Sequence, residues 1–137
     1  MTAPAAGAAP EPAAPVIDAG SRFYWDGLAR GELTVQECTA CGRRRFPPMP
    51  CCPYCAATGT VIRPAAAGTV YSWITVRRAF QPAFTADVPY TIATVDLDGG
   101  GRIAARLEPG EAASPGLRVR PHFVTHSGWT EARFHPE

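Results

Sequence analysis

Hydrophobic and polar residues alternate with a period of two over much of the second half of the chain, as half-buried β-strands require. The alternation runs through residues 70–76, 102–107 and 117–123. In the first of these segments, one predicted face carries Val70, Ser72, Ile74 and Val76. Residues 90–97 predict a buried strand, and Asp98 followed by three glycines predicts a hairpin turn. Pro121 predicts an edge or a bulge in the last strand, because proline has no N–H to donate.

Four or five short strands with no helix between them predict a mostly β protein with a small barrel. The five-stranded OB-fold is the usual barrel at this length, and an SH3-like barrel is the alternative. The chain then divides into a tail over residues 1–20, a helix over 21–32, a cysteine unit over 33–64 and an OB-fold-like barrel with a C-terminal tail over 65–137.

The predicted helix begins after Ser21, a residue type favoured as N-cap, and Gly31 would end it. Its apolar residues exceed what a small ribbon could cover, so one face should dock on the barrel or on another protein. These residues are Phe23, Tyr24, Trp25 and Leu28. The first twenty residues are almost all Ala, Pro and Gly, which bury too little apolar area to offset the entropy of ordering, and they predict a flexible tail.

Composition narrows the classes of function. The chain has 137 residues and a formal net charge of +1, so it exerts no general attraction on nucleic acid or on acidic membranes. No apolar run approaches the roughly 20 residues that cross a bilayer. The N-terminus also lacks the charged-then-apolar order of a secretory signal, and we expect a cytoplasmic protein.

Four of the five cysteines form two C-x-x-C pairs separated by ten residues, which predicts one metal ion held by Cys38, Cys41, Cys52 and Cys55. Tetrahedral thiolate coordination favours zinc, and iron is the alternative because rubredoxin-type sites use the same paired turns. Four protein ligands leave no open position, so the site should be structural. Gly42 can take the backbone angles that direct amides toward the sulfurs. Cys51 is left over.

Three arginines follow the first cysteine pair directly and could offset the negative charge of four thiolates around a dication. A solvated hairpin is the simpler interpretation of the same residues, which are Arg43, Arg44 and Arg45.

At this point the sequence resembles a known family, the acyl-CoA-associated zinc-ribbon plus OB-fold proteins, long classed as a domain of unknown function. The resemblance covers roughly residue 23 to the C-terminus. Its motifs, in order, are the aromatic helix, Cys38-Thr-Ala-Cys41-Gly42, Phe46-Pro47-Pro48, Cys52-Pro53-Tyr54-Cys55, Gly68-Thr-Val-Tyr71-Ser72-Trp73 and Pro89-Tyr90. This chain departs from the pattern at Met49, where arginine is common, and in having Cys51.

The resemblance implies a non-catalytic accessory subunit that binds and stabilises a thiolase-fold enzyme of acyl-CoA metabolism in a hetero-oligomer. Similar proteins support a sterol-carrier-protein-type aldolase in actinobacterial steroid degradation, and an archaeal relative joins a thiolase to a synthase. The partner would carry the chemistry, and the helix residues would be an interface. Arginines would contact the CoA phosphates through charge-assisted hydrogen bonds. The foremost of these are Arg77, Arg78, Arg102 and Arg106, with Arg118 and Arg120 as further members of the set.

Two other classes of function stay open. Zinc ribbons and OB-folds also bind nucleic acid, but such sites need a continuous basic groove with stacking aromatics, and this chain has one short arginine cluster. A self-sufficient enzyme could use His122, His126 and Ser127, although no orienting acid or oxyanion site is marked in the sequence.

Overall fold

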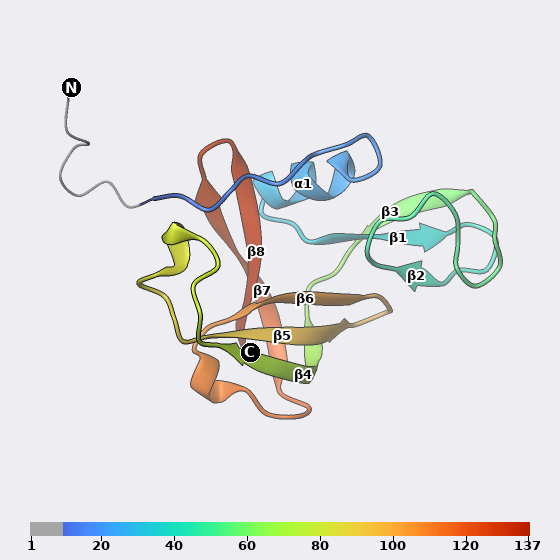
Figure 1. The fold of residues 1–137 in the computed structure, drawn as a ribbon. Helices are drawn as coiled ribbons and strands as arrows, with labels where there is room; N and C mark the ends of the chain where they lie inside the picture. Colours follow the sequence, from blue (N-terminus) through green and yellow to red (C-terminus); the bar gives the residue numbers. More distant parts are fainter. Residues whose placement is uncertain (1–9) are drawn as a thin grey trace, which may run out of the picture.

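The computed structural model describes residues 10–137, which form a three-stranded sheet, a five-stranded barrel and one helix that packs against both (Figure 1). The helix is α1 (Arg22–Ala29), and the small sheet contains β1 (Thr34–Cys38), β2 (Arg44–Arg45) and β3 (Thr60–Pro64). The barrel contains β4 (Gly68–Val76), β5 (Tyr90–Leu97), β6 (Arg102–Leu107), β7 (Arg118–His126) and β8 (Trp129–Pro136). Two 3₁₀ turns, η1 (Pro82–Phe84) and η2 (Gly110–Ala112), lie in the loops.

The small sheet has β1 in the middle, antiparallel to both β2 and β3. We call these three strands and their loops the cysteine ribbon. The barrel order is β4-β5-β6-β8-β7, and β7 returns to pair with the start of β4. A single parallel pairing of Leu107 with Phe134 joins β6 to β8. This architecture confirms the predicted mostly β fold with one short helix and a five-stranded barrel.

The alternation within β6 was predicted correctly except at Arg106, which is also buried, whereas β5, expected only as a buried strand, alternates between half-buried and buried residues. In β6 the inward-facing Ile103, Ala105 and Leu107 are buried. Leu97 and Gly101 close the hairpin between the two strands, since the Leu97 N–H donates to the Gly101 carbonyl. The predicted strand boundaries therefore follow from local pattern and turn chemistry alone.

The predicted face of β4 was wrong after its first residues. A β-bulge between Val70 and Ser72 inserts an extra residue, which moves every later side chain to the opposite face. Trp73 pairs with the buried Ala93 and lies on the inner face, whereas Ile74 pairs with Ile92 and points outward. Sequence alternation cannot reveal a bulge, because both strand faces here carry apolar residues.

The helix docks on the barrel through two buried residues, Tyr24 and Leu28. Both belong to one hydrophobic core that includes Phe134 of β8, and Phe23 and Trp25 pack against it while partly exposed. The Trp25 ring meets the Trp129 ring edge-on at 6.1 Å between centroids. Docking on the barrel is thus one of the two outcomes that the aromatic cluster predicted.

The ends of α1 agree only in part with the sequence. Gly31 follows the helix with φ of +78° and its N–H donates to the Leu28 carbonyl, as a C-terminal glycine should. Ser21 precedes the helix but makes no side-chain cap; its hydroxyl bonds to Asp18 instead. Ser21 is therefore the N-cap residue, as predicted, but its side chain does not cap the helix because the Asp18 carboxylate accepts the hydrogen bond of the hydroxyl.

The segment before the helix lies along the barrel. The Ala13 N–H donates to Gln81 Oε1 at 2.9 Å, and Glu11 accepts from the Ser127 N–H at 3.3 Å. Residues 1–9 lie outside the described part of the chain, and flexibility of the tail stays a prediction. Across residues 10–137, no helix is both long and apolar enough to cross a membrane.

The β5–β6 turn is the point where the barrel approaches the cysteine ribbon. All three of its glycines have positive φ, and Gly100 has a φ of +122°. A Cβ at Gly100 would lie 3.2 Å from Arg44 Cβ and 3.3 Å from the Arg44 carbonyl oxygen. Glycine here therefore permits both the turn and the close packing of the ribbon.

We expect Gly100→Ala to destabilise the chain by about 2 kcal/mol, because it adds a steric conflict with Arg44 to an unfavourable φ. The matched control is Gly116→Ala, where φ is +80° but no atom lies within 4 Å of the new Cβ. The control should cost about 1 kcal/mol or less. Denaturant unfolding of both variants measures the difference, and equal losses would show that the ribbon contact contributes nothing.

Candidate metal centre

The sulfur atoms of the four paired cysteines converge at one end of the cysteine ribbon. All four Sγ atoms lie within 4.8 Å of one another, and the Cys38–Cys55 and Cys41–Cys52 pairs are each 3.6 Å apart. A tetrahedron with Zn–S bonds of about 2.3 Å has S–S edges of about 3.8 Å. The arrangement therefore fits a four-thiolate metal site, and Cys51, which is exposed, lies outside it.

Two turns of the same geometry present these sulfurs. In the first, the Gly42 N–H donates to the Cys38 carbonyl, and the Cys38 N–H donates to the Arg43 carbonyl. The second turn has the same two bonds: the Ala56 N–H donates to the Cys52 carbonyl, and the Cys52 N–H donates to the Ala57 carbonyl. Backbone N–H groups also point at sulfur, from Cys41 to Cys38 at 3.5 Å and from Tyr54 to Cys52 at 3.4 Å. Such bonds stabilise thiolates.

Ala56 was missed by the sequence analysis. It has a φ of +66°, matching the +76° of Gly42 at the equivalent place in the first turn. A residue with a side chain rarely adopts this conformation. The sequence contained the information needed to find it, since Gly42 and Ala56 each directly follow the second cysteine of their pair.

The four sulfurs do not behave as independent thiols. The backbone N–H of Cys41 lowers the pKa of the Cys38 thiol to about 6. For Cys55 the Ala57 N–H acts to lower the pKa, but the neighbouring sulfurs outweigh it and raise the pKa to about 11. Thiolates so close repel one another, and a bound cation would remove that repulsion by displacing the remaining protons.

The three arginines beside the site have separate roles. Arg43 lies over the Tyr54 ring at 4.8 Å, and Arg44 pairs with Glu37 at 3.2 Å. Arg45 is buried and donates to Gln36, Thr60 and the Met49 carbonyl, none of which is charged. They are thus not one solvated cluster, because the ribbon strands direct them to different faces.

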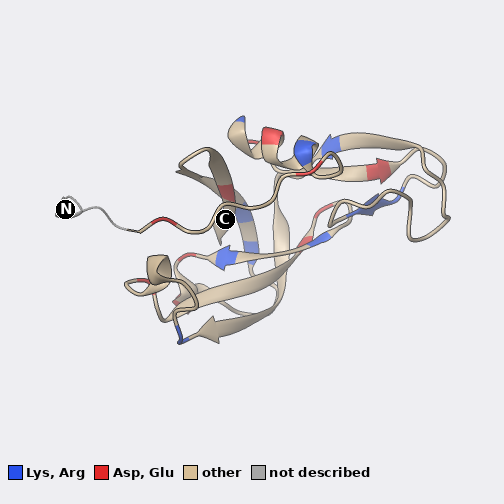
Figure 2. Ribbon diagram, turned by 45° about the horizontal axis from the view of Figure 1, so that its top comes forward, with Lys and Arg blue, Asp and Glu red and all other residues tan. Residues whose placement is uncertain are grey.

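The four arginines expected to meet CoA phosphates are not gathered into one site. Arg102 pairs with Asp96 at 2.6 Å and stacks on Tyr71. The Arg106 side chain is only 7% exposed, pairs with Asp87 at 3.0 Å and lies over Tyr90. Arg77 and Arg78 are exposed after β4 and form no ion pair with any residue from 10 to 137. Figure 2 shows basic and acidic segments interspersed over both modules.

The histidines near the C-terminus belong to a polar cluster on β7 and β8. His126 contacts Glu131 at 2.8 Å and stacks on Trp129, while Arg133 joins Glu131 to Glu108. His122 lies 3.5 Å from Glu108. Within the described chain the Ser127 hydroxyl has no hydrogen bond to either histidine, so the structure does not bring these residues together as a Ser–His pair.

Two family models match the chain. The rubredoxin-like zinc ribbon domain of ChsH2 matches residues 25–61, and the C-terminal OB-fold domain of ChsH2 matches residues 62–124. Among solved structures, a chain of the Ltp2-ChsH2(DUF35) aldolase is 30% identical with a TM-score of 0.79, over 90% of this chain and 98% of that one. A DUF35-family protein of unknown function from Sulfolobus solfataricus is 16% identical with a TM-score of 0.60, over 87% of this chain and 86% of that one. This match shows that the two proteins share a fold.

Two curated relatives are subunits of hydratases. A probable enoyl-CoA hydratase alpha subunit from Thermomonospora curvata is 35% identical over 94 residues, which is 68% of this chain and 29% of the relative. The 3-oxo-4,17-pregnadiene-20-carboxyl-CoA hydratase alpha subunit of Mycobacterium tuberculosis is 29% identical over 125 residues, 84% of this chain and 37% of the relative. The chain thus spans about a third of the length of the curated relatives that it matches.

We expect Cys38→Ser to abolish metal binding and unfold the cysteine ribbon, because metal binding contributes on the order of 10 kcal/mol to folding in small modules. Elemental analysis of the purified chain and thermal melting measure the two effects. Cys51→Ser is the matched control and should keep one metal ion per chain, since Cys51 lies outside the sulfur cluster. A stable, metal-loaded Cys38→Ser variant would contradict the assignment.

The polar cluster predicts a pH-dependent contribution from Glu131. Burial acts to raise the Glu131 pKa, but the bonds from Arg133 and His126 outweigh it, and the folded-state pKa is lowered. A lowered pKa stabilises the fold above the unfolded-state pKa, and this stabilisation is lost as the pH falls through the folded-state value.

Glu131→Gln should therefore cost about 1 kcal/mol at pH 7 and much less in acid, where the parent carboxylate is also neutral. Chemical denaturation of both proteins at pH 7 and across the acid limb measures the difference. Glu111→Gln, at an exposed position with no ion pair among residues 10–137, is the control and should change little at either pH. A Glu131→Gln loss that stays constant with pH would show that packing, not charge, is responsible.

Proposed function

This chain belongs to the ChsH2 family of proteins, which join a rubredoxin-like zinc ribbon to an OB-fold domain, and from that membership we propose that it is a subunit of an acyl-CoA-processing enzyme complex. Its partner would be a thiolase-fold enzyme, either a thiolase or a sterol-carrier-protein-type aldolase. The chain would stabilise that enzyme and would not itself catalyse the reaction.

One observation carries this proposal. The chain aligns with 98% of a ChsH2(DUF35) chain in an aldolase complex at 30% identity. A protein that resembles one component of a two-component enzyme over 90% of its residues is expected to play the corresponding role. The hydratase alpha subunits are further relatives named as parts of larger enzymes, and both names specify CoA thioesters. The pregnadiene name supports a steroid or lipid side chain as the acyl group.

The metal in this proposal is zinc, held by Cys38, Cys41, Cys52 and Cys55. The sulfur spacing fits it, and the matched ribbon model is described as a zinc ribbon. When bound, zinc would supply a four-coordinate crosslink between the two turns and no open position for substrate. Elemental analysis distinguishes zinc from the iron alternative, since both metals accept this ligand set.

The helix residues and the arginines of the predicted set differ in what they still offer to a partner or to acyl-CoA. The helix presents the partly exposed Phe23 and Trp25, whereas Tyr24 and Leu28 are taken up by the core. For acyl-CoA, the two arginines already paired to carboxylates have little charge left to offer. Arg77 and Arg78 are the members of the predicted set whose charge is free for an anionic group outside this chain.

A pull-down of the tagged chain from its native cells tests the proposal. We expect a thiolase-fold enzyme at near-equal molar amount by quantitative mass spectrometry, because a stabilising subunit binds stoichiometrically. The absorbance ratio at 260 and 280 nm checks for nucleic acid in the same sample. Recovery of nucleic acid without a thiolase-fold enzyme would overturn the proposal in favour of a nucleic-acid-binding role.

A further inference from the structure

The second half of β4 has a strand neighbour on one side only. Its pairing with β7 covers Gly68 and Thr69, and Val70 then bonds to Leu117 and Gly116. After the bulge at Tyr71, β5 continues alongside, but no residue of the described chain pairs with the other edge. Every second N–H and C=O group of residues 72–76 therefore faces outward without a backbone partner.

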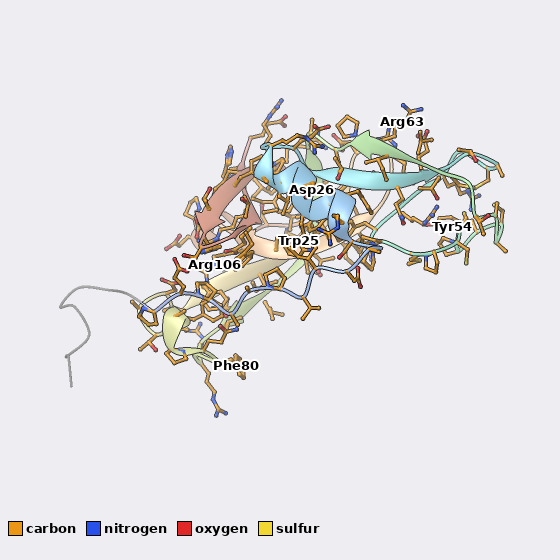
Figure 3. All side chains as sticks on the ribbon, turned by 90° about the horizontal axis from the view of Figure 1, so that it is seen from above. Trp25, Asp26, Tyr54, Arg63, Phe80 and Arg106 are labelled. Atoms are coloured by element: carbon orange, nitrogen blue, oxygen red, sulfur yellow. The ribbon has the colours of Figure 1, made fainter. Side chains whose placement is uncertain are left out.

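The same stretch exposes more large apolar side chains than any other part of the described chain. Ile74 is 63% exposed on the outer face and Trp73 is 38% exposed on the inner face, so both faces of one strand are uncovered. Tyr71 and Phe80 flank them at 60% and 74% exposed. Figure 3 shows Phe80 at the outer edge of the molecule, away from Trp25 on α1. Apolar surface gathered this way marks an interaction site.

This edge also lacks the protection that the ribbon edges carry. Free strand edges in soluble proteins are usually blunted by charged residues or proline. β3, an edge of the ribbon sheet, ends in Arg63 and Pro64, and β2 on the other edge consists of two arginines. Residues 72–76 read Ser-Trp-Ile-Thr-Val and contain neither. An unprotected edge is tolerated when another chain covers it.

Two arginines at the end of β4 indicate the charge that a covering segment should carry. Arg77 and Arg78 come directly after β4, are exposed and have no carboxylate partner among residues 10–137. Arg102, Arg106, Arg118 and Arg133 of the same barrel each pair with at least one carboxylate. A partner with an acidic residue beside its strand would supply the missing charge and fix the register.

We propose that an extended segment of the thiolase-fold partner adds a strand to β4 along residues 72–76. Its backbone bonds to the free edge, its apolar side chains cover Trp73 and Ile74, and an acidic residue meets Arg77 or Arg78. This mode of binding, β-strand addition, takes affinity from the backbone and specificity from the flanking side chains. The inference rests on the proposed function for the identity of the partner.

Hydrogen exchange of backbone amides on the isolated complex and on the free chain tests the strand addition directly. We expect the outward amides of residues 72–76 to exchange at least about tenfold more slowly in the complex. A complex that contains the thiolase-fold enzyme but leaves these amides unprotected overturns the strand addition and leaves the proposed function standing. Protection that appears in the free chain as its concentration rises would instead identify a second copy as the occupant.

A pair of variants provides the second measurement. Ile74→Glu should weaken binding of the co-purified enzyme by about 30-fold, the size of a hot-spot loss. Ile62→Glu, at an exposed isoleucine on the edge strand β3, is the matched control and should change binding less than about twofold. Equal effects of the two variants at unchanged melting temperature overturn the assignment to β4. Failure to recover any thiolase-fold enzyme overturns the proposed function, and the named occupant with it.

Discussion

The packing of α1 and β1 against the barrel is the constraint on which the rest of the structure depends. Leu28, Leu33 and Val35 come from the N-terminal part of the chain, and they share one buried core with Val95 and Phe134 of the barrel. Neither module alone has the apolar area of an ordinary domain, since small domains bury a smaller fraction of their surface. The shared core joins the two into one unit and holds the ribbon at the β5–β6 turn.

The position of this common core explains why a metal crosslink is needed in the ribbon and not in the barrel. The sulfur cluster lies at the far end of the ribbon, where few apolar residues are available, and a metal crosslink there would replace the missing core. The barrel, closed by its own strands and by α1, needs no such crosslink. The second half of β4 can therefore lack a strand neighbour on one side within the chain and stay available to a partner.

Most charged side chains of the barrel are also neutralised by neighbours within the chain. Most arginines of the barrel pair with a nearby carboxylate, which neutralises them within the chain. The buried Arg45 instead donates from Nε and Nη2 to the neutral oxygens of Gln36 and Thr60, which ties β2 to the neighbouring strands, while its Nη1 has no partner among the described residues. A surface with so many internal pairs has little general attraction for polyanions, and this favours specific protein contacts over binding to nucleic acid.

The sequence by itself determined the features that depend on residues close together in the chain. The C-x-x-C spacing, the glycine-rich turn and the two-residue period of β6 each act over a few residues, and the structure reproduces them. The tertiary structure alone decided which way β4 faces beyond its bulge, that Tyr24 and Leu28 are core residues, and which arginines are already paired. These outcomes depend on neighbours distant in sequence, because burial and ion pairing are set by whichever segment the fold brings alongside.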